Sequence, residues 1–433
     1  MSKVASGNTE LAYTRKERGI TIVSCMLGTF FDAVAFLLIN FLVFPMSRYF
    51  HASIAEIVLS ITINVIGISI GGIIFGWTAD RIGRRWTLMI TAGTFAVFLV
   101  LTGFITSLWE LYALRFLSGV GIGGELGTSY AFLVEVWPQK TRGLGGAAIV
   151  SLFQWGNLAA VIISGAALSA YGLDFGWRAA WFIAGGVSFA LFAFRPFLPE
   201  SKLWKKYNDA RREGKLPPNY RARSPLIEIF SRDVIKFTIL GTGIWAGYLF
   251  FISGFQPFIP TLFESTYKIS TSTFTQLSII AFVPSAFIVL LNGFLADRVG
   301  RRIASLVFAA AVILSSITFI FVVRGPLPSD VAIVASPLFY SYFFVTQADG
   351  ANGSLPSWLP ELYPTRMRGT GTNFTLQVGR LIGSGLAPIL VPLLAVSQGL
   401  GVSMGLIMLM GGIILVLSEI RLKESKGLEL SSF

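Results

Sequence analysis

The chain has 433 residues, of which 54% are hydrophobic and only 13% are charged, and its mean hydropathy is +0.71. A soluble protein carries about twice that charged fraction, so the composition indicates a membrane-embedded chain. One cysteine and one histidine leave no basis for a disulfide framework or for a metal centre, and the net charge of +12 raises the question of a nucleic-acid partner.

The apolar residues gather into twelve stretches that are each long enough to cross a bilayer as a helix, which takes about 20 residues. The polar tail before the first stretch, and the length of that stretch, predict no cleavable signal peptide. The sequence therefore predicts an all-α membrane protein with twelve transmembrane helices, near 20–45, 56–78, 86–107, 109–136, 144–171, 178–198, 235–262, 273–296, 303–323, 331–358, 370–395 and 400–418.

Three ionisable residues lie inside the first four spans, where a buried charge costs at least about 2.5 kcal/mol and is therefore a functional candidate. Asp32 lies near the middle of span 1, and Arg115 and Glu125 lie on span 4. We expect Asp32 to pair with Arg115 and to carry a proton, because arginine keeps its proton whereas a carboxylate can exchange one. A static ion pair is the alternative for Asp32. Glu125 is a second candidate proton site, and a helix-contact role is its alternative.

Span 5 carries two amide side chains, Gln154 and Asn157, which are costly to turn toward lipid and are therefore candidate substrate ligands. Residues 199–234 form the longest polar stretch and predict a linker between an N-terminal bundle (1–198) and a C-terminal bundle (235–433).

The second half carries most of the remaining substrate candidates. Arg380 in span 11 presents a guanidinium fork that fits a carboxylate, and its alternative is an internal pair with Asp349 of span 10, which is itself a candidate substrate residue. The other candidates share a polar or amphipathic side chain within a span: Trp245, Tyr248, Gln256, Tyr340 and Gln377. A single aromatic residue at such a place is more often a packing residue than a ligand.

One motif occurs twice. Residues 76–85 (GWTADRIGRR) match residues 293–302 (GFLADRVGRR), so that Asp80 and Asp297 lie 217 positions apart, about half the chain. A second pair joins 135–143 (EVWPQKTRG) with 361–369 (ELYPTRMRG), and a third joins Glu200 with Glu424. These repeats indicate two pseudo-symmetric halves of six helices.

The basic residues give the orientation. Of the 34 Lys and Arg, 27 lie in the two tails and in the loops after even-numbered spans, and four lie on the other side. Because cytoplasmic loops carry the Lys/Arg excess, both termini are expected in the cytoplasm of a cell-membrane protein. The positive charge then reflects topology and implies no nucleic-acid partner.

All three repeated pairs fall on this predicted cytoplasmic side, where arginines and carboxylates can clamp the two halves together. If these arginines served only to keep the loops in the cytoplasm, acidic residues and glycines would not be needed at matched positions in both halves. We therefore expect a cytoplasmic gate formed by Asp80, Arg81, Arg85, Glu135, Arg142, Glu200, Asp297, Arg298, Arg302, Glu361, Arg368 and Glu424.

At these residues the whole chain resembles the major facilitator superfamily, whose most specific signature is the G-x-x-x-D-R-x-G-R-R loop after spans 2 and 8. The resemblance implies two six-helix bundles around a central cavity and alternating access. In that family a span-1 acid that faces the span-4 arginine, here Arg115, is associated with proton coupling. Residues 377–383 and 361–371 resemble the aromatic-acid and metabolite proton symporters and the organic-ion transporters, in which the span-11 arginine faces the cavity.

The sequence thus predicts a secondary active transporter that carries a small organic anion together with protons. The anion is a carboxylate, and aromatic acids belong to the class. Sugar porters are neighbours, but their span-7 Q-Q-x-x-G-x-N pattern is absent and Val150 replaces their span-5 glutamine. A sugar or polyol symporter and a drug/proton exporter remain alternatives, as does a transporter-like receptor. Nothing suggests an enzyme or a cofactor, and we expect a monomer that binds substrate and protons within the bilayer.

Overall fold

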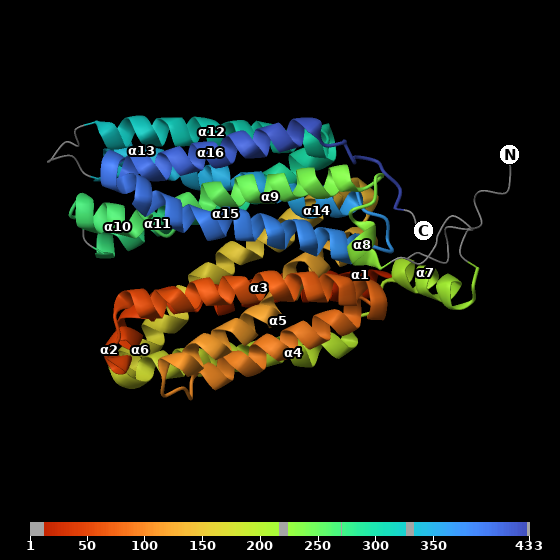
Figure 1. Cartoon of the computed structure of the whole chain (residues 1–433), viewed down its shortest axis with the longest axis horizontal. Helices are drawn as coiled ribbons and strands as arrows, with labels where there is room; N and C mark the ends of the chain where they lie inside the picture. Colours follow the sequence, from red (N-terminus) through yellow and green to blue (C-terminus); the bar gives the residue numbers. More distant parts are fainter. Residues whose placement is uncertain (1–12, 216–223, 270, 326–332, 431–433) are drawn as a thin grey trace.

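A computed structural model describes residues 13–215, 224–269, 271–325 and 333–430. Within these ranges the regular structure is entirely helical, and the long helices run side by side along the longest axis of the molecule in two bundles (Figure 1). We call the bundle of α1–α6 the N half and the bundle of α9–α16 the C half.

The helices of the N half follow the predicted spans. Ser53 and Ser107 each start a helix with a capping box, in which the serine and a glutamate three residues later satisfy each other's backbone N–H groups. The two spans predicted at 144–171 and 178–198 form one element that is interrupted only at Gly172, whose φ of 71° departs from the helix. The elements are α1 (Arg15–Leu37), α2 (Val43–Phe50), α3 (Ile54–Ile82), α4 (Arg84–Thr102), α5 (Leu108–Val136) and α6 (Arg142–Phe194).

Two helices lie within the predicted linker, α7 (Lys202–Arg212) and α8 (Pro225–Glu228). The C half then repeats the order of the N half. Its elements are α9 (Ile235–Phe255), α10 (Ile259–Thr261), α11 (Thr271–Val299), α12 (Arg301–Arg324), α13 (Pro337–Ala348), α14 (Leu355–Glu361), α15 (Arg368–Gln398) and α16 (Leu400–Arg421).

The span predicted at 331–358 differs from the structure, because it is not one continuous helix. A short 3-10 segment, η6 (Asp349–Gly353), separates α13 from α14. Its sequence, Asp-Gly-Ala-Asn-Gly, has poor helix propensity, and Pro356 in the first turn of α14 is suited to a new helix start. The break places Asp349 at the end of α13 rather than inside a regular helix.

In the described part, nine helical stretches are long and apolar enough to cross a membrane. One of them, of 59 residues, covers both spans of α6, while α5 and the broken span of α13 and α14 are not among the nine. This pattern agrees with a multi-pass membrane protein of two helical bundles.

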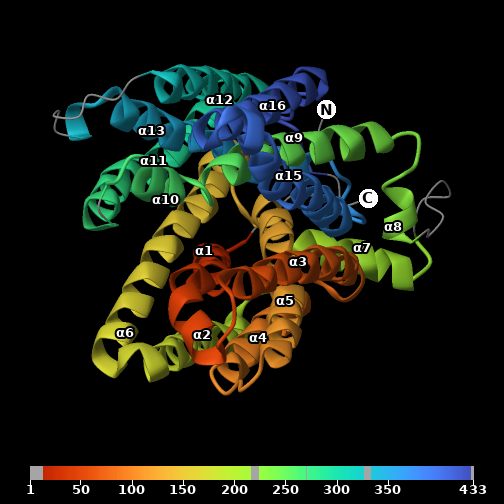
Figure 2. The ribbon, with the colours of Figure 1, turned by 60° about the vertical axis from the view of Figure 1, so that its left-hand side comes forward.

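Helix α1 begins and α16 ends at one end of the molecule, where α7 and α8 also lie; we call this end the terminal face (Figure 1). The halves meet along two helix pairs, α3 with α15 and α6 with α11. Figure 2 shows the first of these pairs side by side. The repeated motifs lie at the ends of these helices, so the terminal face is where the two halves are joined by polar contacts.

Candidate functional site

Glu135 is the centre of a buried charge network at the terminal face. Its Oε1 accepts from Nη2 of Arg84 at 3.0 Å and from Nη1 of Arg368 at 2.7 Å, and its Oε2 accepts from the Ser201 hydroxyl. Arg368 belongs to the C half, and all three charged side chains are almost completely buried. The network therefore ties the two halves together where water cannot weaken the ion pairs.

Glu361 repeats this arrangement in the C half. It lies 3.5 Å from Nη1 of Arg142 and 3.5 Å from Nε of Arg301, and it accepts from the hydroxyl of Ser425. Arg142 comes from the N half, so the second network also crosses between the halves. The matched segments 135–143 and 361–369 thus make equivalent contacts between the two halves.

Asp80 and Asp297 cap helices of the opposite half. The carboxylate of Asp80 accepts from the backbone N–H groups of Gly369 at 3.0 Å and of Thr370 at 2.7 Å, in the first turn of α15. Asp297 accepts from the N–H groups of Gly143 and Leu144, both at 2.8 Å, in the first turn of α6. Neither helix has a side-chain cap from its own N-cap residue. The aspartates supply it, and the positive helix ends stabilise their charge.

Glu200 and Glu424 serve the start of α4 and of α12 in the same way. Glu200 accepts from the N–H of Arg84 at 2.9 Å, and Glu424 accepts from the N–H of Arg301 at 2.9 Å. The residues before these helices, Gly83 and Gly300, have φ of 106° and 109° and no side chain that could cap. Burial raises the pKa of Glu200, and the backbone N–H groups around it oppose that rise.

The guanidinium groups of four arginines predicted for the gate do not enter these networks, although the backbone N–H groups of Arg85 and Arg302 donate to Glu200 and Glu424. The guanidinium of Arg81 stacks on Trp77 and that of Arg298 on Phe294, at 4.5 and 4.3 Å from the ring centres. The guanidinium groups of Arg85 and Arg302 donate to the backbone carbonyls of Pro196 and Ile420.

Arg84 and Arg301 are the arginines of the repeated motifs that do enter the networks. The sequence analysis did not identify either of them. Each lies four residues after the repeated aspartate, at 3.0 Å for Asp80–Arg84 and 2.6 Å for Asp297–Arg301. The signal was present in the repeat, since both copies carry an arginine four residues after the aspartate. Each pair spans the turn at Gly83 or Gly300 rather than one helix.

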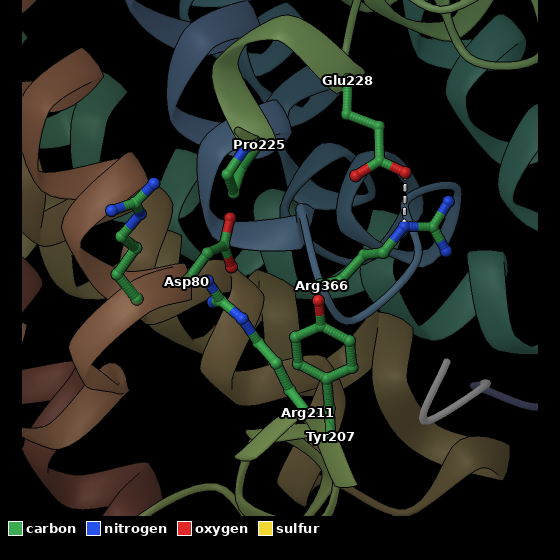
Figure 3. Close-up of a pocket in the computed structure, with 7 residues that line it drawn as sticks. Asp80, Tyr207, Arg211, Pro225, Glu228 and Arg366 are labelled. Atoms are coloured by element: carbon green, nitrogen blue, oxygen red, sulfur yellow. Dashed lines mark hydrogen bonds and ion pairs between the residues drawn. The ribbon is translucent and has the colours of Figure 1, made fainter. Parts of the chain in front are cut away.

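The linker covers this network. Trp204 of α7 donates from Nε1 to the carbonyl of Asp80 at 2.9 Å, and Glu228 of α8 pairs with Nε of Arg366 at 2.5 Å. Figure 3 shows the small pocket that results, in which Tyr207 and Arg211 of α7 face Asp80 of the N half and Arg366 of the C half. Both halves and the linker therefore contribute to the closed terminal face.

A second polar cluster lies in the interior, around Asp349. Its Oδ2 accepts from Nε2 of Gln154 in the N half at 2.5 Å, and its Oδ1 accepts from the Tyr248 hydroxyl at 2.5 Å. The ring of Tyr248 lies 6.1 Å from that of Trp245, which in turn stacks on Tyr130 at 6.4 Å with an interplanar angle of 6°. Three predicted substrate candidates and Asp349 are thus brought together.

Arg380 follows Gly379 in α15, and Gly379 packs against Trp245 of this cluster. Nη1 of Arg380 donates to Oε1 of Gln377 at 3.3 Å, and Gln377 donates to the carbonyl of Gly123 in the N half at 2.9 Å. The alternative pair between Arg380 and Asp349 is not formed, since both oxygens of Asp349 accept from neutral donors.

The expected pair of Asp32 with Arg115 is absent from the structure. Arg115 donates to the carbonyls of Ala35 and Phe36 at 3.1 and 3.4 Å and to Oδ1 of Asn64 at 3.0 Å. The last turn of α1 offers carbonyls without helical partners and a negative dipole end, and these hold the cation. Oδ1 of Asp32 is buried without a hydrogen-bond partner.

Glu125 forms a fully buried ion pair with Arg195 and also accepts from the Thr91 hydroxyl at 3.0 Å. The remaining candidates are dispersed. Asn157 and Gln256 are partly exposed and make no side-chain hydrogen bond within the described residues, and Tyr340 is 61% exposed beside Phe339. The structure does not bring these three to the cluster.

Comparison with known proteins agrees with this architecture. The family model described as Major Facilitator Superfamily matches residues 25–388. A Bacillus subtilis protein named "Putative niacin/nicotinamide transporter NiaP" is 28% identical over 85% of this chain and 86% of its own. The Escherichia coli sialic acid transporter NanX is 25% identical over 92% of each chain.

Solved structures are similar in fold. The proton:xylose symporter XylE superposes with a TM-score of 0.77 over 96% of this chain and 98% of its own, at 16% identity. The human organic anion transporter MFSD10 gives a TM-score of 0.64 over 92% and 99%, also at 16% identity. At such identity the likeness concerns the fold alone.

Proposed function

The chain belongs to the Major Facilitator Superfamily, a family of membrane transporters and not of enzymes, and we propose that it carries a small organic anion together with protons by alternating access. The observation that carries this proposal is Arg380, a cation in the middle of α15 that makes one side-chain hydrogen bond, to a neutral amide. A membrane-embedded cation is costly unless it has a partner, and a substrate carboxylate would supply one.

The surroundings of Arg380 support an organic rather than an inorganic anion. Trp245 and Tyr130 offer stacked rings next to it, and an apolar site with a few placed polar groups suits a small organic acid. Relatives named for niacin and for sialic acid bear names of carboxylic acids, which favours the same class for this chain.

Proton coupling would follow from competition for the same arginine. Asp32 is buried, and its Oδ1 has no hydrogen-bond partner within the described residues. Burial disfavours the charged form of a carboxylate, and a nearby guanidinium such as that of Arg380 would favour it. A substrate carboxylate that binds Arg380 would reduce this support, so that Asp32 would take up a proton. Substrate and proton would then load together, and loss of the substrate would release the proton.

Alternating access requires the terminal face to open on release. In this reading the terminal face is cytoplasmic, the described structure is closed on that side, and the networks of Glu135 and Glu361 are the inner gate. The carboxylate caps by Asp80 and Asp297 would break and re-form as rigid halves rock.

A thermal-shift screen of the purified protein tests the substrate class, with carboxylates, sugars and cationic drugs each measured at two pH values. We expect carboxylates to raise the Tm of the wild type and to lose this effect in Arg380→Gln. Stabilisation by sugars alone would reject the organic-anion proposal in favour of a sugar porter, and stabilisation by cations alone would favour an exporter.

Coupling is tested separately in proteoliposomes with an imposed pH gradient. Asp32→Asn should still exchange substrate across the membrane but should no longer accumulate it against a gradient. Undiminished accumulation by the variant would remove Asp32 as the proton carrier while leaving the substrate assignment intact.

A further inference from the structure

An open groove of about 340 Å³ lies at the terminal face between the ends of α3 and α4 and the linker helix α7. We call it the α7 groove. Its lining includes Ile82, Arg85, Trp86, Lys205, Asp209 and Arg212. It is separate from the interior cluster and from the pocket of Figure 3, and the proposed transport cycle gives it no role.

Two exposed apolar stripes lead to the α7 groove along the membrane-spanning helices. On α3 the stripe runs through Ile66, Ile70 and Ile74 to Ile82, and on α4 it runs from Trp86 through Ile90, Val97 and Leu101. At about 100° per residue, the set on α4 stays within about 60° of one side of the helix, whereas the set on α3 winds through about 160° between Ile66 and Ile82. Both spans lie in stretches that are apolar enough to cross a membrane, so these sides face acyl chains.

The charges at the mouth of the α7 groove are mostly positive, and none of the three cations forms an ion pair within the described residues. Lys205 and Arg212 are exposed and form no ion pair within the described residues, and Arg85 lies against the ring of Trp86. The carboxylate of Glu200 is satisfied by the backbone N–H groups of Arg84, Arg85 and Ser201. The three cations of the lining therefore face two carboxylates, Asp209 and this backbone-bound Glu200.

Taken together, these features lead us to propose that the α7 groove binds an anionic phospholipid, with the headgroup phosphate among Arg85, Lys205 and Arg212 and the acyl chains along the stripes of α3 and α4. The pattern fits an amphiphile whose polar and apolar parts are divided at the membrane boundary. A tryptophan at that boundary is typical of the interface, and clustered Lys and Arg there attract anionic lipid. A soluble phosphate compound would use the charges but would leave the stripes unused.

Native mass spectrometry of the purified full-length protein, titrated with phosphatidylglycerol and with phosphatidylcholine in detergent, tests this site. We expect one phosphatidylglycerol to be retained in preference to phosphatidylcholine. Lys205→Gln/Arg212→Gln should weaken phosphatidylglycerol binding roughly 30-fold, which corresponds to ~1 kcal/mol for each lost cation.

The matched control is Lys206→Gln/Lys215→Gln, which removes the same charge from exposed positions outside the groove lining. It should bind phosphatidylglycerol as the wild type does. A further arm adds glycerol 3-phosphate, which should not displace the lipid at millimolar concentration.

Three results would overturn the proposal: equal loss in both double variants, no preference between the two lipids, or displacement by glycerol 3-phosphate. A Tm measured for each variant in phosphatidylcholine identifies misfolding. If Lys205→Gln/Arg212→Gln is unstable, the single variant Lys205→Gln replaces it, with Lys206→Gln as its control and an expected loss of roughly fivefold.

Discussion

The buried arginines of the terminal face all lie against carboxylates, whereas Arg380 in the interior is held by an amide. This difference separates arginines that hold the two halves together from the arginine that is proposed to bind substrate. Arg84, Arg301 and Arg368 are consumed by contacts within the protein. Arg380 retains N–H groups for a partner that the protein does not supply, which is the basis for assigning it to the substrate.

Asp80→Asn is predicted to weaken the closed terminal face. The change removes the charge that holds Arg84 and that faces the N–H groups of Gly369 and Thr370, and charged hydrogen bonds of this kind contribute about 1.5–3 kcal/mol each. The measurement is the rate at which a thiol reagent modifies Ala147→Cys, a position buried in the face between α6 and α11, in a Cys25→Ala background.

Asp297→Asn is the matched comparison. The Asp297 side chain is 9% exposed, against 0% for Asp80, so its replacement should increase the modification rate by less. Unchanged reactivity in both variants would count against a gate at this face.

Glu125→Gln is predicted to destabilise the fold rather than to abolish coupling alone. It leaves Arg195 fully buried without a counter-charge, which typically costs about 3–5 kcal/mol, and the Tm should fall accordingly. The double variant Glu125→Gln/Arg195→Gln should recover part of the loss. If the single variant keeps its Tm but loses pH-driven accumulation, Glu125 is a proton site and not a structural partner.

At the scale of elements, the halves approach closely enough for backbone to touch backbone. A Cβ on Gly143 of α6 would lie 2.5 Å from the carbonyl oxygen of Gly293 in α11, whereas a Cβ on Gly369 of α15 would have its nearest neighbour at 3.0 Å. The neighbour of Gly143 is backbone, which cannot move aside as the Asp80 side chain next to Gly369 can. The backbone of Gly143 is helical and would accept any residue. The close contact with α11 is therefore what requires glycine at this position.

Gly143→Ala should consequently prevent full closure of the terminal face. We expect faster modification of the Ala147→Cys reporter and a lower rate of substrate exchange, because one state of the cycle is obstructed. Gly165→Ala in the same helix is the control, since a Cβ there meets nothing within 4 Å. An equal effect of both variants would point to helix propensity instead of the contact.

On the scale of the whole molecule, the two halves are joined at the terminal face by two equivalent sets of contacts. Glu135 with Arg368, and Glu361 with Arg142, are related by the repeat and each crosses between the halves. The interior departs from this symmetry, because Asp32 lies in the N half while Asp349 and Arg380 lie in the C half. Symmetric contacts suit a motion that both halves share, and asymmetric charges suit recognition of one ligand.

The orientation of the molecule is testable with single cysteines and a membrane-impermeant thiol reagent. Lys206→Cys on the terminal face should react only after cells are permeabilised, whereas Asp174→Cys, in the loop predicted on the other side, should react in intact cells. Wild-type protein is the control, since its one cysteine, Cys25, is fully buried. The opposite pattern would place the terminal face outside and reverse the direction assigned to the gate.

The sequence alone determined the membrane class, the helical elements and the duplication, because apolar length, the capping residues and a repeat at half-chain spacing are local or periodic properties. It also placed Glu135, Glu361, Asp80 and Asp297 among the gate candidates, and the structure brings these four to one face. It did not identify the break at Asp349–Gly353, although the glycines there carried a signal.

Only the tertiary structure decided which charges meet. Arg84 rather than Arg81 or Arg85 reaches Glu135, and Arg115 turns to the end of α1 instead of to Asp32. Such pairs join residues that are 51 to 233 positions apart, and the partner depends on how each helix is rotated and how closely its neighbours approach. Spacing along one helix fixes which residues share a side, but the crossing of two helices fixes what that side touches.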